Sequence, residues 1–246
     1  MGEKSLKVER SSRRVSLDGG YESFEGDDVL FVNVDGYSGN RLGSSRAAHW
    51  MLLESVFAEL STDDDDLTLI TPRGKDTLQA VRRNGLFIFR ANRASDIVQA
   101  MAFGEAHKLR IVISGGQEAW MVRDALADAD VPVVINALDN LPGSFDGLGA
   151  RLDNAALLHE AGVTVLFTSG ETHNARKLRQ VAGNAVANGL PHGAAIEAMT
   201  SLPAEIFGGT PRMIAPGLAA DLVIWSGDPL EAVSYTHLTL PTILLV

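Results

Sequence analysis

The sequence predicts an α/β fold, a parallel sheet covered by helices, and three observations lead to this prediction. Short apolar runs alternate with helical stripes from residue 86 onward. The runs are apolar at nearly every position, as strands buried on both faces are. They begin at residues 86, 110, 131 and 163, so the steps are 24, 21 and 32 residues. An eight-unit barrel averages about 25–31 residues per unit. We therefore expect about four C-terminal β/α units of a partial, TIM-like (β/α)8 barrel.

The individual elements follow from the same patterns. Strands are expected at residues 86–90, 110–114, 131–136 and 163–168. Helices are expected from a cap at Ser95 onward and at residues 117–129, 152–159 and 174–188. Before this region, residues 29–34 predict a strand and residues 44–59 predict a helix. After it, a helix is expected from Ser201 and a strand at residues 221–226.

The last residues, 234–246, depart from the barrel pattern. Their sequence resembles a translated adapter or vector segment that recurs at the ends of unrelated environmental reading frames. We therefore predict a non-native tail and leave it out of the functional argument. The alternative is a native C-terminal strand.

Composition excludes several classes of protein. The chain has 246 residues, no cysteine and 46% hydrophobic residues, so it can bury a core but forms no disulfide, thiolate zinc site or cysteine nucleophile. Its net charge of -10 argues against nucleic-acid binding. No apolar run reaches the roughly 18 residues of a membrane helix, so no membrane partner is expected. No signal peptide is visible, and the localisation is left open.

Chemistry in such barrels lies at the carboxyl ends of the strands. The last of the four strands is followed by Glu171 and His173, a carboxylate and an imidazole that can act as acid–base partners or metal ligands. Ser114-Gly115-Gly116 follows an earlier strand and is either a tight turn or an anion-binding loop. The acidic run 63–66 is better explained as a solvated turn than as a calcium site. His159 and His192 are expected to have local, structural roles.

Residues 86–231 resemble the C-terminal half of an amidohydrolase, in the imidazolonepropionase-like branch. The segments that carry the resemblance are 92–97 (NRASDI), 116–120 (GQEAW), 153–156 (DNAA), 173–176 (HNAR), 182–186 (AGNAV), 200–204 (TSLPA), 220–225 (ADLVIW) and 227–231 (GDPLE). The family fold is a (β/α)8 barrel beside a small β-sandwich. The resemblance implies an irregular lead-in with one helix over residues 1–85, the remnant of an N-terminal half. It further implies a half-barrel over 86–209 and a β-sandwich remnant over 210–233.

The resemblance also implies a chemistry, from which this sequence departs. Family members hydrolyse C–N bonds with a divalent metal such as zinc, which activates a water. The usual ligands are a His-x-His pair, two further histidines and an aspartate, and this set is absent from the chain. Arg90 or Asn92 stands at one histidine position, Ser114 at another, and Ser169 or Glu171 near the aspartate position. We therefore predict no metal ligands, and which cofactor acts here is left open.

We expect an amidohydrolase-type hydrolase acting on an amide, cyclic amide or peptide-like bond of a small polar substrate, inactive as this fragment. Glu171 and His173 are the candidate catalytic residues. The candidate substrate-binding residues are Arg90, which would hold a carboxylate, with Asn92, Glu118, Asn140 and Arg176. One alternative is a non-catalytic binding barrel, and another is a phosphate-binding barrel enzyme that uses the glycine loop. Exposed barrel edges also predict self-association.

Overall fold

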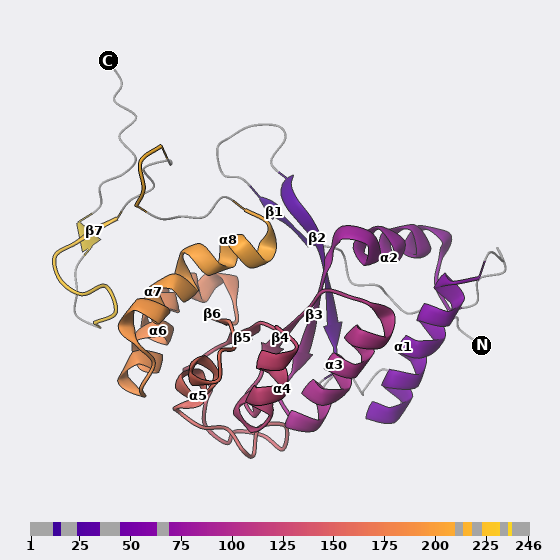
Figure 1. The fold of residues 1–246 in the computed structure, drawn as a ribbon, viewed down its shortest axis with the longest axis horizontal. Helices are drawn as coiled ribbons and strands as arrows, with labels where there is room; N and C mark the ends of the chain where they lie inside the picture. Colours follow the sequence, from indigo (N-terminus) through magenta and orange to yellow (C-terminus); the bar gives the residue numbers. More distant parts are fainter. Residues whose placement is uncertain are drawn as a thin grey trace. The chain divides into compact units, whose positions relative to one another are not determined.

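The computed structural model describes seven stretches of the chain, which are residues 12–15, 24–34, 45–62, 69–209, 214–217, 223–231 and 236–237. The acidic run 63–66 and most of the predicted tail lie outside these residues. Contacts between Cα atoms divide the chain into two compact units, Met1–Gly116 (unit 1) and Gln117–Val246 (unit 2). Each unit is described by itself (Figure 1). The domain boundaries predicted from the sequence stay a prediction.

Unit 1 is a sheet of four strands with three helices. Its elements are β1 (Ser12–Val15), β2 (Phe24–Asn33), α1 (Arg46–Leu60), α2 (Pro72–Asn84), β3 (Leu86–Ala91), α3 (Ala94–His107) and β4 (Ile111–Gly115). The strand order is β1-β2-β3-β4; β1 is antiparallel to β2, whereas β2, β3 and β4 are parallel. The strands predicted at residues 86–90 and 110–114 are confirmed within one residue at each end, and the strand predicted at 29–34 is confirmed but begins five residues earlier, at Phe24.

The helices of unit 1 begin where short polar side chains cap them. Ser45 caps α1, where its hydroxyl accepts a hydrogen bond from the backbone N–H of Ala48. Thr71 caps α2 in the same way and Pro72 follows at the first helical position. The lead-in predicted with one helix therefore contains two, and its strand β2 joins the sheet. Ser95, predicted to cap α3, lies inside that helix instead.

Aromatic rings fill the core between the helices and the sheet of unit 1. Trp50 of α1 stacks on Phe89 of β3 at 6.1 Å between ring centroids, and Phe103 of α3 meets the same ring at 6.0 Å. Phe57 of α1 lies 4.9 Å from Phe103, edge to face. Helices α1 and α3 thus cover the face of β3 to which Phe89 points.

Unit 2 is built from shorter elements. They are η2 (Ala119–Val122), α4 (Arg123–Asp128), β5 (Val133–Ile135), α5 (Asn154–Glu160), β6 (Val165–Phe167), η3 (Thr172–Lys177), α6 (Leu178–Ala187), α7 (His192–Met199), α8 (Ser201–Phe207), β7 (Ile224–Trp225) and β8 (Thr236–His237). Strands β5 and β6 pair in parallel, and β7 pairs with β8 antiparallel. The β7–β8 pair includes two residues of the predicted tail, whose origin stays a prediction.

Two predicted helices of unit 2 are wrong at their amino-terminal ends. Residues 119–122 and 172–177 form 3-10 turns before α4 and α6 begin. Trp120 supplies the reason for the first: its backbone N–H donates to Asn154 Oδ1 at 3.1 Å, and its indole N–H donates to the Gly149 carbonyl at 2.8 Å. These tethers hold the turn to a neighbouring loop.

The segment 223–231 lies against helix α6, and small side chains allow the approach. A Cβ at Gly183 would collide with the carbonyl oxygen of Leu230, and Leu230 itself is buried. His192 Nε2 lies 3.0 Å from the carboxylate of Asp228, and Arg179 lies over the ring of Trp225 at 5.3 Å. These contacts attach the segment after the barrel region to unit 2.

Among the described residues, no helix is long and apolar enough to cross a membrane.

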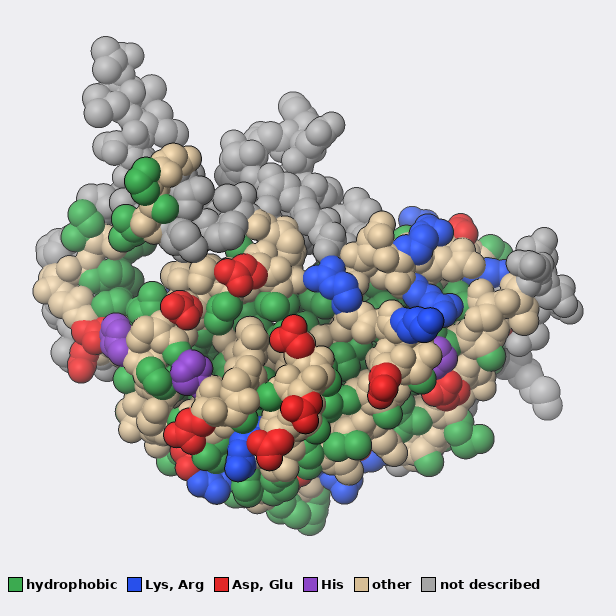
Figure 2. Space-filling model, in the orientation of Figure 1, with side chains coloured by type: hydrophobic (Ala, Val, Ile, Leu, Met, Phe, Trp, Pro, Cys, Tyr) green, Lys and Arg blue, Asp and Glu red, His purple; other side chains and the backbone are tan. Residues whose placement is uncertain are grey.

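On the face drawn in Figure 2, basic side chains gather over the α2 part of unit 1, whereas acidic side chains are spread widely. On this face, the acidic side chains therefore do not gather over a single element.

Candidate functional site

The carboxyl ends of β2, β3 and β4 bring three polar residues into one row. Asn33 is the register partner of Arg90, and Arg90 is the register partner of Ser114. Register partners in parallel strands point to the same face of a sheet, and successive residues point to opposite faces. Because Phe89 points to the helices, the row Asn33–Arg90–Ser114 points to the other face, which becomes the interior in a barrel.

The row has unused hydrogen-bonding capacity. The guanidinium of Arg90 is exposed and forms no hydrogen bond or ion pair with any described residue. Asn33 Oδ1 is buried without a partner in the same part of the structure. A planar guanidinium flanked by an amide and a hydroxyl can hold a carboxylate. Arg90 was predicted from the sequence for this role, whereas Asn33 was missed, although it ends a predicted strand.

Two further residues of unit 1 frame this strand end. Asn92 is half-buried and its amide lies against Gly115, whose φ of +100° only glycine adopts readily. Gly116 also has a positive φ, of 57°. The two positive φ values are what a tight turn at Ser114-Gly115-Gly116 requires, one of the two interpretations that the sequence left open.

A buried ion pair below this strand end was missed by sequence reasoning. Asp96, in the first turn of α3, is 3% exposed and pairs with Arg46 at the start of α1. The same guanidinium donates to the carbonyl of Val34, just after β2. The pair links three segments at the carboxyl ends of β2 and β3. An acid in the first turn of a helix is a sequence feature that could have indicated it.

In unit 2, the loop after β5 is held by its own side chains. The amide of Asn136 donates to Asp139 Oδ2 at 2.7 Å, and the amide of Gln117 donates to the Asp139 carbonyl at 2.8 Å. Asn140 follows, 1% exposed, and neither atom of its side-chain amide has a hydrogen-bond partner in the described part of the chain. A buried amide without partners costs about 1–3 kcal/mol, so a polar group of a water or ligand is expected beside it.

The loop after β6 brings Glu171 and His173 together. Nε2 of His173 lies 3.0 Å from Oε2 of Glu171, and the two side chains are 74% and 63% exposed. The pair stands at the carboxyl end of a parallel strand, where barrel enzymes carry their chemistry. A carboxylate on one ring nitrogen fixes the imidazole tautomer and leaves Nδ1 to exchange a proton. The sequence had left acid–base and metal-binding roles open for these two residues.

The remaining two predicted site residues lie elsewhere in unit 2. Glu118 accepts a hydrogen bond from the backbone N–H of Gly149 at 2.9 Å and so supports the loop before α5. Arg176 is exposed on η3 and forms no ion pair with Glu171 or any other described residue. Their substrate-binding roles stay predictions.

The residues described do not fit the metal that the resemblance implies. No group of three or more His, Asp or Glu side chains that could hold a metal ion occurs among them. Glu171 and His173 supply two neighbouring donors, and a tight mononuclear site needs three or four ligands. We therefore derive no step through a metal from these side chains.

Comparisons with known proteins agree with this architecture. No family model matches the chain. The amidohydrolase tasK of Hapsidospora irregularis is 27% identical over 132 residues, which are 52% of this chain and 13% of that protein. The crystal structure of an amidohydrolase from Thermotoga maritima superposes with a TM-score of 0.75 at 21% identity. That match covers 87% of this chain and 61% of the Thermotoga chain.

A third match, a prolidase complexed with N-methylphosphonate-L-proline, has a TM-score of 0.41 over 60% of this chain and is too loose to support a conclusion. The first two confirm the resemblance to the amidohydrolase superfamily, and the Thermotoga structure confirms the α/β, TIM-like barrel fold. The imidazolonepropionase-like branch stays a prediction. The chain spans less than two thirds of both relatives, so an activity of the whole protein is a matter for proposal.

Proposed function

We propose that this protein is an amidohydrolase-type hydrolase that cleaves an amide, cyclic amide or peptide-like C–N bond in a small polar substrate. The observation that supports this most is the contact of His173 with Glu171 at the carboxyl end of β6. For unit 1 taken by itself, we propose that Arg90 holds a carboxylate, because its guanidinium is exposed and unpaired among the described residues at a strand end. Asn140 supplies hydrogen bonds from its unpartnered amide.

The proposed chemistry uses proton transfer by the pair. Glu171 accepts the Nε2–H of His173, and Nδ1 takes a proton from a water molecule. The water oxygen forms a bond to the carbonyl carbon and gives a tetrahedral intermediate. The imidazolium then returns its proton to the leaving nitrogen as the C–N bond breaks. The products are a carboxylic acid and an amine, and the pair ends as it began.

The test is turnover by the longest reading frame that contains this chain, because we expect this chain alone to be inactive. Amides, lactams and dipeptides are screened with wild-type protein, Glu171→Gln and His173→Asn. Each variant is expected to lower kcat by about 100-fold, the usual size of a general acid–base effect. His192 and Asp228 form a matched control, since they lie at the same 3.0 Å separation but Asp228 follows the antiparallel strand β7 and not a strand of the parallel sheet. Asp228→Asn should retain the turnover.

The competing candidate is a binding barrel that has lost catalysis. It is favoured by the donor set, in which the described residues supply no three-ligand metal group. Under this function, small carboxylates raise the Tm of the protein but are not turned over. Turnover that disappears in Glu171→Gln, in a protein that still melts cooperatively, would exclude the binding barrel.

A further inference from the structure

A pocket lies at the opposite, amino-terminal end of β6. It has a volume of about 210 Å³, is open to solvent on one side, and is lined within unit 2 by residues of α5, the start of β6, α7 and α8. Thr164, one of its lining residues, directly precedes β6, whereas the Glu171–His173 pair follows β6. The strand from Thr164 to Thr168 separates the two ends by about 13 Å, at roughly 3.3 Å per residue. The pocket is therefore a separate place in the fold.

The walls of the pocket combine apolar and polar surface in similar amounts. Val163, Val165 and Leu190 are buried and form its inner part, with Ala194 and Leu202 beside them. An engineered, fully apolar cavity of about 150 Å³ is large enough to bind benzene, which gives a scale for the volume. A volume of about 210 Å³ thus suits a body of one ring or a short branched chain.

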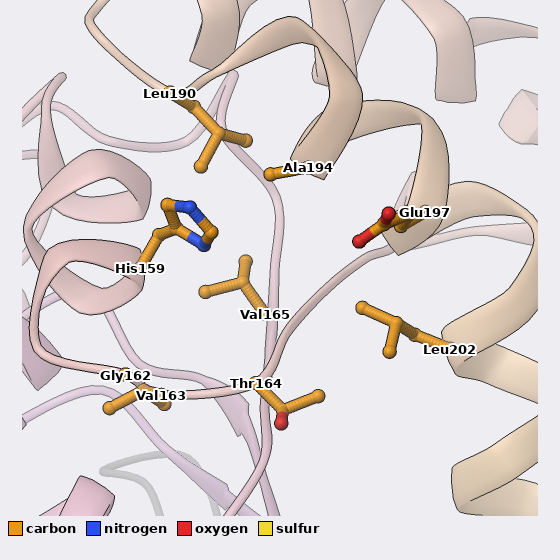
Figure 3. A pocket seen from close by; sticks show the side chains of 9 residues that line it. All are labelled: His159, Gly162, Val163, Thr164, Val165, Leu190, Ala194, Glu197 and Leu202. Carbon is orange, nitrogen blue, oxygen red and sulfur yellow. The ribbon is translucent and has the colours of Figure 1, made fainter.

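Two ionisable side chains enter this pocket from different helices. Figure 3 shows the imidazole of His159, from α5, and the carboxylate of Glu197, from α7, projecting into the same space from opposite sides. Neither side chain forms a hydrogen bond or ion pair with any described residue, including each other. Thr164 adds a hydroxyl at the rim. The pocket therefore presents one exposed, unpaired carboxylate at its open side, beside the buried apolar side chains of its inner part.

We propose that this pocket binds a small amphipathic cation, an ammonium or amidinium group on a compact apolar body. The cation pairs with Glu197, and the apolar body lies against Val165 and Leu190. His159 and Thr164 complete the site as hydrogen-bonding groups. The net charge of -10 favours a cation over an anion as it approaches. The inference does not depend on the proposed hydrolase activity, because it uses none of the residues at the carboxyl end of β6.

The experiment titrates the purified chain with benzylamine, benzyl alcohol and benzoate, followed by ligand-observed NMR. The three probes share one ring and differ in charge. Benzylamine is expected to bind with a Kd on the order of 1 mM, a value typical of so small a ligand. Benzyl alcohol and benzoate are expected to bind about fivefold more weakly, because neither can pair with Glu197.

Three variants locate the binding. Glu197→Gln keeps the shape of the side chain and removes its charge. It should weaken the binding of benzylamine about fivefold and leave the binding of benzyl alcohol unchanged. Ala194→Leu fills the pocket and should abolish binding of all three probes. Glu205→Gln removes an exposed acid on α8 that does not line the pocket and should change nothing. A thermal melt of each variant verifies that it remains folded.

The proposal is overturned by any of three results. The first is that benzoate binds as tightly as benzylamine, which would mean that the pocket binds anions through His159. The second is that benzylamine binds Glu197→Gln as tightly as the wild type, which would mean that benzylamine binds elsewhere on the acidic surface. The third is that benzylamine binding to the folded wild-type chain does not saturate at about 20 mM, a concentration far above the expected Kd.

Discussion

The two units pack their helices with side chains of opposite size. In unit 1 the rings of Trp50, Phe57, Phe89 and Phe103 lie between helices and sheet. In unit 2 the buried positions of α5, α6 and α7 are dominated by alanines, which are Ala155, Ala156, Ala182, Ala185, Ala195 and Ala198. Large rings fill a wide gap, whereas alanine and glycine let backbones approach closely. Unit 1 should therefore be sensitive to lost volume, and unit 2 to added volume.

The strand ends of the two units differ as well. In unit 1, Arg90 and the Oδ1 of Asn33 have no partner among the described residues. In unit 2, Asn136 and Asp139 hold each other, and Glu171 contacts His173. Unpaired groups are suited to receiving a ligand, and paired groups are suited to moving a proton within a fixed geometry. The contrast is consistent with the proposed binding role of Arg90 and the proposed proton transfer by Glu171 and His173.

The largest effect is expected from removing volume in unit 1. Phe89→Ala deletes a ring that is 0% exposed and contacts Trp50 and Phe103. The free energy of unfolding should fall by about 3–5 kcal/mol, the range for large-to-small core substitutions. Phe31→Ala is the control, because Phe31 is 39% exposed on the face opposite the helices and should cost far less. Equilibrium unfolding in urea measures both, and equal losses would contradict the aromatic-core description.

Adding one methyl group tests the close packing of unit 2. Gly183→Ala places a Cβ against the carbonyl of Leu230, so the segment 223–231 must shift. We expect a loss of about 1–3 kcal/mol in unfolding free energy. Gly193→Ala is the matched control: it is also in a helix, but its Cβ would meet no atom within 4 Å. That change should be neutral or stabilising by up to about 1 kcal/mol. Similar effects of the two substitutions would rule out the close approach as the cause.

The binding role of the unit 1 strand end is tested by charge removal. Arg90→Gln should weaken succinate binding about tenfold, because the bidentate partner of a carboxylate is lost. Its stability should change by less than about 0.5 kcal/mol, since Arg90 has no partner among the described residues. Arg83→Gln, which changes an exposed arginine of α2 that has no partner among the described residues and is not a predicted site residue, should leave succinate binding as it is. Chemical-shift titration by NMR measures succinate binding to both variants. An equal loss of affinity in both would mean that succinate binding depends only on the net charge of the protein.

The smallest effect is expected on how far the Tm falls when the pH is lowered below about 4, through Asp228 in unit 2. The hydrogen bond from His192, helped by the backbone N–H of Leu230, lowers the pKa of Asp228 below its ordinary value. A lowered pKa stabilises the folded state above the unfolded-state pKa, near 4, and this contribution is lost as the pH falls through the lowered value. Asp228→Asn should therefore flatten the fall of Tm between about pH 4 and pH 2. Asp124→Asn, which removes a carboxylate that is 86% exposed, is the control. If Tm falls with pH in Asp228→Asn as it does in the wild type, the His192–Asp228 pair does not stabilise the segment 223–231.

Most elements could be predicted because their residues repeat at the period of their secondary structure. The strand at 86–90 and the helix behind Ser45 are examples, since burial and capping leave a local pattern. Helix α2 was missed although Thr71 and Pro72 mark its start, because an acidic run precedes it and Gly74 and charged residues dilute its apolar stripe. The 3-10 turn at Trp120 had no local sign, since its cause is a hydrogen bond to Asn154.

The sequence by itself determined where strands end and which polar residues follow them, including Arg90, Glu171 and His173. The tertiary structure alone decided that Asn33, Arg90 and Ser114 form one row, that Asp96 is buried against Arg46, and that His159 and Glu197 share a pocket. The physical reason is that local patterns record burial and backbone preference within a few residues. Register between strands and packing between helices join residues far apart in the chain, and these depend on the whole set of contacts.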